Sequence, residues 1–337
     1  MTSPGHRIMV IGTSAGGLEA LDRVIGGLPP SLPASIFIVQ HLDPDNSGAA
    51  LLDRLGRYKG FSCKLAEDGE VFKKAGIYIA PTDYHLLIKN KTVLVRKGAR
   101  ENRYRPAIDP LFRSAAVAHG PAVIGVILTG LLDDGTAGLL AVKKCGGIAV
   151  VQDPRDAAYP AMPQSVLNHL KPDHCLPAAQ MGRLLGTLVR RPAGRRTQIP
   201  DDIRTEALIA ERVLSDVARV DRLGERAAHN CPNCGGVLWE MDSPAVQRYR
   251  CHTGHSFTAS TLLASQSEKI EETLWICLRM LEERKNLLTA MAGKETRPGA
   301  KKAYKERILE TGVHVAGVRD MLLTRNAGLG GDVSSIR

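Results

Sequence analysis

Short apolar runs alternate with longer amphipathic stretches over residues 7–180. The apolar runs predict strands at Ile8–Gly12, Ser35–Gln40, Ile77–Ala80, Val123–Thr129 and Ile148–Gln152. Helical spacing of apolar positions follows at Leu18–Ile25, Ala49–Leu55, Pro110–Ala118, Ala137–Lys144 and Pro163–Leu170. The run Val123–Leu128 is apolar at every position except Gly125, which is typical of a strand covered on both faces. This alternation predicts an α/β fold with a doubly wound, mostly parallel sheet.

One antiparallel excursion interrupts this pattern. Leu86–Lys89 and Thr92–Arg96 read as strands on either side of Asn90-Lys91, a dipeptide suited to a tight turn. We therefore expect a β-hairpin within the domain.

The second half of the chain has a different organisation. Prolines, glycine and four arginines make residues 186–200 a plausible boundary, and Asp201–Glu225 then shows the apolar stripe of a helix. A small Cys/His module and two further helices, over Leu262–Met291 and Lys301–Leu323, follow. We divide the chain into a domain (1–185), a basic linker and helix (186–228), a Cys/His module (229–260), a helical region (261–325) and a tail (326–337) that we expect to be disordered.

Composition narrows the class of protein. Of the 337 residues, 44% are hydrophobic and 24% charged, as in soluble globular proteins. The apolar runs fall short of the ~20 residues of a membrane span, and Gly12 interrupts the N-terminal one too early for a signal peptide. We therefore expect a cytoplasmic protein without membrane insertion.

The net charge of +10 is spread over both halves of the chain. The cluster Arg190, Arg191, Arg195 and Arg196 fits a solvated linker better than a nucleic-acid arm. Aromatic residues make up only 4% of the chain, which argues against stacking on single-stranded nucleic acid.

The segment Val10-Ile-Gly-Thr-Ser-Ala-Gly-Gly17 carries the first chemical signal. It places Ser14 at the tip of a strand-to-helix turn, beside the free N–H groups of a helix start. This geometry suits a nucleophile whose tetrahedral intermediate needs an oxyanion site, and the N–H groups of Ala15, Gly16 and Gly17 are candidate donors. A phosphate-binding glycine turn, or a tight connection without chemistry, remains an alternative.

Polar residues follow two further predicted strands. His41 comes after the second strand, and Asp133 and Asp134 come after Val123–Thr129. Each residue alone is more typical of a structural role, as a hydrogen-bonded histidine or a turn aspartate. Because carboxyl ends of parallel strands share one edge, the three residue types together favour a nucleophile, a base and an orienting acid. Their order along the chain differs from that of the α/β-hydrolases.

Six ordered segments resemble the catalytic domain of the chemotaxis protein-glutamate methylesterases, the CheB family. They are Gly12-Thr-Ser-Ala-Gly-Gly17, Val39-Gln-His41, Ala80-Pro-Thr-Asp-Tyr-His85, Arg105-Pro-Ala-Ile-Asp-Pro-Leu-Phe112, Leu128-Thr-Gly-Leu-Leu-Asp-Asp-Gly135 and Ala161-Met-Pro-Gln-Ser165. The resemblance implies Ser14 as nucleophile, His41 as base and Asp134 as orienting acid, with no cofactor for catalysis. It also implies hydrolysis of glutamate γ-methyl esters on chemoreceptor-like signalling proteins, with release of methanol and glutamine deamidation as a second reaction.

The same segments contain further candidates and some departures. Leu131 is a further oxyanion candidate, and Arg105 could either recognise acidic residues beside the ester or form ion pairs that order its loop. The family commonly has threonine where this chain has Ala15, and Met-Gly where it has Leu131-Leu132. Because the first predicted strand already begins near residue 7, we expect neither a receiver domain nor control by phosphorylation within this chain.

Cys231, Cys234, Cys251 and His255 form a C-x2-C-x16-C-x3-H pattern. Three thiolates and an imidazole suit tetrahedral Zn²⁺, and a filled ligand set indicates a structural site. His255 has the best spacing for the fourth ligand, while His252 and His229 remain alternatives. The module is similar to a zinc ribbon.

A rival interpretation makes this chain a non-catalytic zinc-ribbon adaptor whose esterase-like domain only binds receptor or partner helices. The apolar stripes of the C-terminal helices suit docking of a regulatory protein as well as core packing. An assay of methanol release separates the two interpretations.

Overall fold

A computed structural model describes residues 6–42, 48–213, 216–241 and 245–328. The chain divides into two compact units, Met1–Leu262 and Leu263–Arg337. Among the helices described, none is both long enough and apolar enough to cross a bilayer.

The first unit is built on a seven-stranded sheet in the order β3-β4-β2-β1-β7-β8-β9. All neighbouring strands run parallel, which confirms the predicted fold class. The strands are β1 (Arg7–Thr13), β2 (Ala34–Gln40), β3 (Ser62–Leu65), β4 (Gly76–Ile79), β7 (Val123–Ile127), β8 (Ile148–Gln152) and β9 (His174–Leu176). Strands β3 and β9, which are short and partly exposed at the two edges of the sheet, were not predicted.

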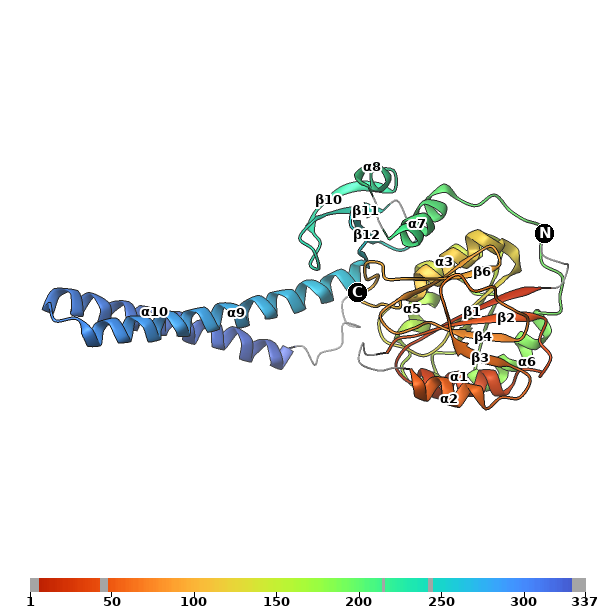
Figure 1. The fold of residues 1–337 in the computed structure, drawn as a ribbon, viewed down its shortest axis with the longest axis horizontal. Coiled ribbons are helices and arrows are strands. Elements are labelled where there is room, and N and C mark those ends of the chain that lie inside the picture. The colour runs from red at the N-terminus through yellow and green to blue at the C-terminus, as the bar shows by residue number, and fades with distance from the viewer. Residues whose placement is uncertain (1–5, 43–47, 214–215, 242–244, 329–337) are drawn as a thin grey trace. The chain divides into compact units, whose positions relative to one another are not determined.

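Helices cover both faces of this sheet (Figure 1). One layer consists of α1 (Gly17–Gly26), α2 (Ala49–Gly56) and α6 (Ala178–Leu188). Of these three helices, α6 was not predicted. The other consists of α3 (Ile108–His119), α4 (Thr136–Lys144) and α5 (Ala161–His169), with a short 3-10 turn, η1 (Gly120–Ala122), before β7. Strands β1 and β2 are buried along their whole length, so the carboxyl ends of two central strands are held rigidly.

The predicted hairpin is present as β5 (His85–Lys89) and β6 (Thr92–Arg96), paired antiparallel. Asn90 takes a φ of +53° in its turn, a conformation that asparagine tolerates better than most residues. The hairpin packs on the α3 side of the sheet.

The predicted helix Asp201–Glu225 is wrong in extent. Helix α7 (Asp201–Arg212) ends at Val213, which has a φ of +63°, and the short helix α8 (Val217–Val220) follows. The chain from Gly224 onward pairs with a neighbouring strand, where a β-carbon at Gly224 would lie 1.9 Å from the carbonyl oxygen of Glu240. The helix therefore stops where Val213 adopts the left-handed conformation, and sheet pairing takes over the last two residues of the predicted helix.

The Cys/His module is a four-stranded antiparallel sheet that begins at residue 224 rather than 229. Its strands are β10 (Gly224–Asn230), β11 (Val237–Met241), β12 (Arg248–Cys251) and β13 (Ser256–Thr258). We call residues 224–258 the ribbon. It belongs to the same compact unit as the parallel sheet.

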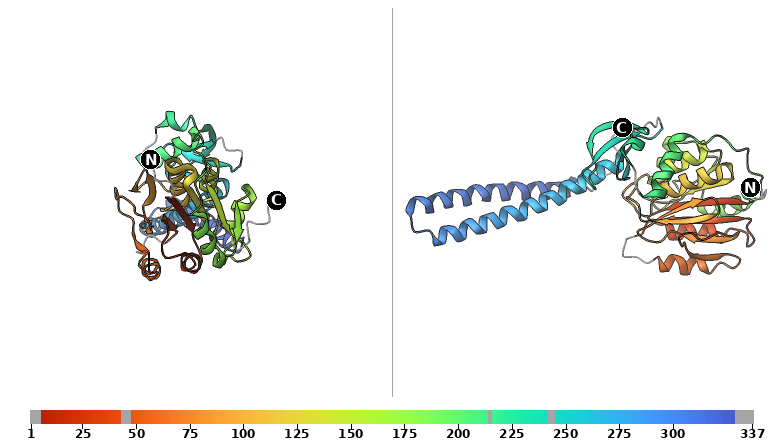
Figure 2. Two further views of the ribbon diagram at one scale, coloured as in Figure 1. Left: turned by 90° about the vertical axis from the view of Figure 1, so that its right-hand side faces the viewer. Right: turned by 45° about the horizontal axis from the view of Figure 1, so that its top comes forward.

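Two long helices, α9 (Ala259–Lys294) and α10 (Pro298–Gly328), close the described chain. They lie side by side as an antiparallel pair (Figure 2), and Arg319 and Glu282 form an ion pair of 2.7 Å between them. Both run beyond their predicted ends, and α10 includes residues 326–328 of the expected tail. Residues 329–337 of that tail lie outside the described residues.

Candidate active site

Ser14 and His41 lie side by side at the carboxyl edge of the sheet. Each directly follows its strand, and the preceding residues, Thr13 and Gln40, are register partners on β1 and β2. The Gln40 side chain donates hydrogen bonds to the carbonyls of Ser14 (2.7 Å) and His41 (3.0 Å). Ser14 is 8% exposed and His41 is 9% exposed. The two backbones are therefore tied together.

His41 and Asp134 are in direct contact, with 2.8 Å between His41 Nε2 and Asp134 Oδ2. An ionised carboxylate only accepts hydrogen bonds, so Nε2 carries the proton and Nδ1 is left as an acceptor. Nδ1 is buried without a hydrogen-bond partner among the described residues, and no hydrogen bond joins it to Ser14 Oγ there. The His41 ring stacks on Tyr104 with 3.6 Å between ring centres.

Asp134 also caps a helix to which it does not belong. Its carboxylate accepts from the N–H groups of Ile108 (2.7 Å) and Asp109 (3.3 Å) in the first turn of α3, and from Asn102 Nδ2 (2.9 Å). The capping position of α3 is Ala107, whose side chain cannot cap. The positive end of α3 therefore stabilises the negative charge of Asp134.

Asp109 performs the reciprocal function for α4. Its Oδ1 accepts from the N–H groups of Gly135 (3.1 Å) and Gly138 (2.6 Å), and its Oδ2 accepts from Asn102 Nδ2 (2.8 Å). Burial and the nearby charge of Asp134 raise the pKa of Asp109. The two aspartates thus cross-cap α3 and α4, with the Asn102 amide between them.

The structure separates the two aspartates that the sequence left side by side. Asp133 accepts a hydrogen bond from the Ser260 hydroxyl, and burial raises the pKa of its carboxyl. Asp134, and not Asp133, contacts the imidazole.

The candidate oxyanion donors differ in availability. The Gly17 N–H donates to the Ser14 carbonyl (3.0 Å) and is engaged. Within the described ranges, the N–H groups of Ala15, Gly16 and Leu131 have no hydrogen-bond acceptor. Gly130 lies directly against the turn that carries Ser14, since a β-carbon there would be 2.8 Å from the β-carbon of Ser14.

Arg105 links its own loop to the loop between β4 and β5. Its Nε and Nη2 donate to Asp83 Oδ1 (2.8 and 2.6 Å), and its Nη1 donates to the Gly98 carbonyl (2.7 Å). Hydrogen bonding to Arg105 lowers the pKa of Asp83. These contacts are the ones expected from the loop-ordering interpretation of Arg105.

The ribbon brings together Cys231, Cys234, Cys251 and His255, whose ligand atoms all lie within 4.8 Å of one another. Cys251 Sγ lies 3.8 Å from Cys234 Sγ and 3.5 Å from His255 Nδ1. Tetrahedral zinc bound at its usual bond lengths would separate two sulfurs by about 3.8 Å, and sulfur from nitrogen by about 3.5 Å. The donor set therefore fits Zn²⁺, and it includes His255 rather than His252 or His229.

Two further residues of the site were not predicted from the sequence: Asn102, which contacts Asp134, and Tyr104, which stacks on His41. Neither follows a strand of the sheet, so the rule that found Ser14, His41 and Asp134 could not find them. The available signal was the turn-forming character of Asn102.

Comparisons with a family model, with curated proteins and with solved structures all lead to the CheB methylesterases. The family model described as CheB methylesterase matches residues 9–185. The crystal structure of the Thermotoga maritima CheB methylesterase catalytic domain superposes with a TM-score of 0.52 at 37% identity, over 54% of this chain and 98% of that domain.

Several curated relatives carry the name protein-glutamate methylesterase/protein-glutamine glutaminase. The Methanosarcina mazei protein, with the suffix 2, is 35% identical over 193 residues, which are 55% of this chain and 52% of that protein. The Thermotoga maritima protein is 38% identical over 187 residues, 54% of each chain. A Leptospira interrogans protein, named "Putative protein-glutamate methylesterase/protein-glutamine glutaminase", is 40% identical over 182 residues, which are 53% of this chain and 93% of that protein. The chain thus spans about half the length of the first two relatives.

Proposed function

The chain belongs to the CheB methylesterase family, and from this premise we propose that it hydrolyses glutamate γ-methyl esters on chemoreceptor-like signalling proteins. Methanol is the product, and glutamine deamidation, with ammonia as leaving group, is a second reaction of the same site. The observation that carries the proposal is the 2.8 Å contact between His41 and Asp134, one strand away from Ser14.

The residue types define the mechanism. Ser14 Oγ attacks the ester carbonyl carbon while His41 Nδ1 takes the hydroxyl proton, and Asp134 holds the Nε2 tautomer and stabilises the imidazolium. His41 then gives the proton to the departing methoxy group, and water cleaves the glutamyl-enzyme. The missing Ser14–His41 hydrogen bond is compatible with this scheme, because catalytic hydrogen bonds often tighten only when substrate binds.

The carbonyl oxygen becomes negatively charged in the tetrahedral intermediate and needs donors. We assign the N–H groups of Ala15, Gly16 and Leu131 to this role, because they are free of other acceptors in the part of the chain described. Each such donor contributes on the order of 3 kcal/mol to lowering the barrier.

Replacing Ser14 by alanine tests the function. The expected result is complete loss of methanol release from a methylated receptor, whereas Ser31→Ala, at an exposed serine, leaves the rate unchanged. If Ser14→Ala turned over substrate like the wild type, Ser14 would not be the nucleophile. A wild-type protein that binds receptor helices without releasing methanol would instead favour the adaptor interpretation.

We also propose that the ribbon holds one structural Zn²⁺ through Cys231, Cys234, Cys251 and His255, on the distances given above. The ion would cross-link the two turns that carry these ligands and take no part in ester hydrolysis. Metal analysis of reduced protein should find about one zinc per chain, and none after Cys234→Ala.

Three thiolate ligands require a reducing compartment, so we place the reaction in the cytoplasm. The net charge of +10 favours association with the acidic faces of receptor helices. The exposed apolar residues of α9 and α10, among them Ile276, Met280 and Leu309, are proposed to dock a regulatory protein.

A further inference from the structure

We propose that the ribbon is a working part of the esterase active centre, because it fixes a turn through which Asn102 positions Asp134. The inference rests on the catalytic roles assigned above. The turn comprises residues 100–104, and we call it the 100–104 turn.

The 100–104 turn has a defined geometry. The N–H of Glu101 donates to the carbonyl of Tyr104 (3.2 Å), and the N–H of Tyr104 donates to the carbonyl of Glu101 (2.9 Å). Asn102 and Arg103 between them have φ values of +50° and +77°, as in a type I′ turn. This rigid form fixes the directions of the Glu101, Asn102 and Tyr104 side chains.

Two of these side chains enter the active site. Asn102 Nδ2 donates to Asp134 (2.9 Å) and to Asp109 (2.8 Å), and Asn102 itself is 1% exposed. A donor between two buried carboxylates offsets their repulsion and directs the Asp134 oxygens. Tyr104 covers the face of the His41 ring. The turn therefore orients both partners of the His41–Asp134 pair.

The backbone of the same turn is bound to the ribbon. The N–H of Asn102 donates to the carbonyl of Ser256 (2.8 Å), and the N–H of Ser256 donates to the carbonyl of Arg100 (3.4 Å). Ser256 opens β13 and directly follows His255 of the metal site. Asn102 thus binds Asp134 through its side-chain amide and binds the ribbon through its own backbone N–H, at the residue next to His255 of the metal site.

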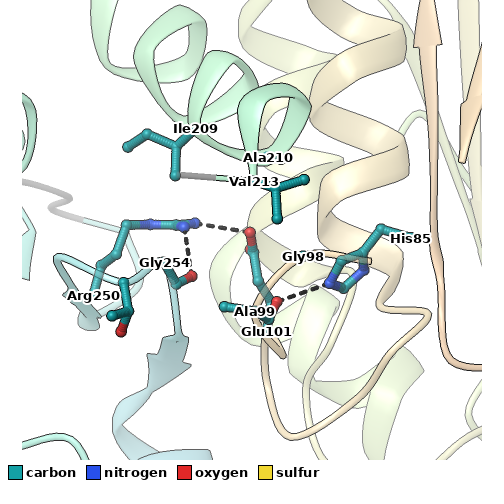
Figure 3. Close-up of a pocket in the computed structure, with 10 residues that line it drawn as sticks. His85, Gly98, Ala99, Glu101, Ile209, Ala210, Val213, Arg250 and Gly254 are labelled. Carbon is teal, nitrogen blue, oxygen red and sulfur yellow. Dashed lines mark hydrogen bonds and ion pairs between the residues drawn. The ribbon is translucent and has the colours of Figure 1, made fainter. Parts of the chain in front are cut away.

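Buried charges reinforce this attachment. Glu101 pairs with Arg113 of α3 (2.7 Å) and with Arg250 of the ribbon (3.0 Å). Figure 3 shows the Arg250 guanidinium between the Glu101 carboxylate and the Gly254 carbonyl, to which it donates at 3.0 Å. Burial alone would raise the pKa of Glu101, but Arg113 and Arg250 hold it at about 2.

A second carboxylate completes the cluster. Glu206 of α7 accepts hydrogen bonds from both Nη atoms of Arg248 (3.0 and 2.6 Å). It also contacts Arg250 (3.2 Å) and Arg113 (3.3 Å). We call Glu101, Arg113, Glu206, Arg248 and Arg250 the buried charge cluster. It joins the ribbon to α3, to α7 and to the 100–104 turn. Displacing the ribbon would remove Arg248 and Arg250 and leave the buried carboxylates Glu101 and Glu206 with fewer ion-pair partners, which is unfavourable.

Asn102→Gly in the full zinc-loaded chain tests the inference. Glycine accepts the φ of +50° without strain, so the variant removes the amide and keeps the turn. Asn90→Gly, at an exposed asparagine with a φ of +53°, is the matched control. We expect kcat for methanol release to fall about tenfold or more with KM nearly unchanged in Asn102→Gly, and no change in Asn90→Gly.

A second measurement does not depend on turnover. We expect the proton between His41 Nε2 and Asp134 to give a low-field NMR resonance, which should shift or vanish in Asn102→Gly and persist in Asn90→Gly. Removing zinc from the wild-type chain with a chelator should cause the same change, reversed by added zinc.

The outcomes are distinct. Unchanged kcat and an unchanged resonance in Asn102→Gly would overturn the positioning role, and a resonance insensitive to zinc removal would overturn the role of the ribbon. If wild-type protein releases no methanol, the proposed function fails, and the resonance alone then decides the positioning role.

Discussion

Replacing Glu101 by glutamine would show how strongly the buried charge cluster stabilises the Met1–Leu262 unit. Glutamine keeps the shape of the side chain and removes its charge. Glu101 now contacts Arg113 at 2.7 and 2.9 Å and Arg250 at 3.0 Å. After the substitution, Glu206 is the cluster's remaining carboxylate, facing three arginines.

The size of the effect follows from the pKa of Glu101. Its pKa falls from 4.5 to about 2 in the folded protein. At about 1.36 kcal/mol per pH unit, this difference corresponds to about 3 kcal/mol of folding free energy at neutral pH. Breaking a buried ion pair typically costs about 3–5 kcal/mol, so the two figures agree. The loss is a large fraction of the total of about 5–15 kcal/mol for a typical domain.

Urea unfolding followed by tryptophan fluorescence measures this loss. The chain has two tryptophans, so a Trp275→Phe background leaves Trp239 of β11, which is 2% exposed, as the reporter. Glu211→Gln is the matched control, because Glu211 lies on α7 and pairs with the half-exposed Lys89. We expect the control to lose less than about 1 kcal/mol.

The pH dependence gives a further check. A carboxyl with a depressed pKa stabilises the fold above its unfolded pKa and loses that contribution as pH falls through its folded pKa. The difference between wild type and Glu101→Gln should therefore be full above about pH 5 and shrink toward pH 2. A Glu101→Gln protein within about 1 kcal/mol of wild type at pH 7, or a difference that does not shrink in acid, would refute the reasoning.

Two further substitutions test the surroundings of Ser14. In Gly130→Ala the new β-carbon would lie 2.0 Å from Met162 Sδ and 2.8 Å from the Ser14 β-carbon, so methanol release should collapse and stability should drop by about 1–3 kcal/mol. Gly56→Ala, where nothing lies within 4 Å, is the control, and equal behaviour of the two variants in activity and thermal unfolding would contradict the expected clash. Leu132 has a φ of +63°, where the family commonly has glycine, so Leu132→Gly should leave thermal stability unchanged or raise it by up to about 1 kcal/mol. A drop of more than about 1 kcal/mol in Leu132→Gly would show that packing of the leucine outweighs its strain.

The sequence predicted the parallel sheet well, because its central strands are continuous apolar runs and its helices are strongly periodic. It did not predict β3 and β9, which are short strands of partly exposed residues, and the predicted helix ran to Glu225 although α7 ends at Arg212. Those errors share a cause: edge strands and helix ends are set by contacts with distant segments rather than by local pattern. Positions 224–230 became a strand because β11 offered a partner.

The sequence by itself placed the candidate catalytic residues at one edge of the sheet. Parallel strands must end at a common edge, so Ser14, His41 and the Asp133-Asp134 pair could be placed near one another from their order alone. The resemblance to the family already singled out Asp134. The contact of Asp134 rather than Asp133 with His41, the cross-capping of α3 and α4, and the contact of the ribbon with the 100–104 turn required the tertiary structure. In these features, residues separated by 7 to about 150 positions in the sequence come within hydrogen-bond distance of one another. No local pattern in the chain encodes such an approach.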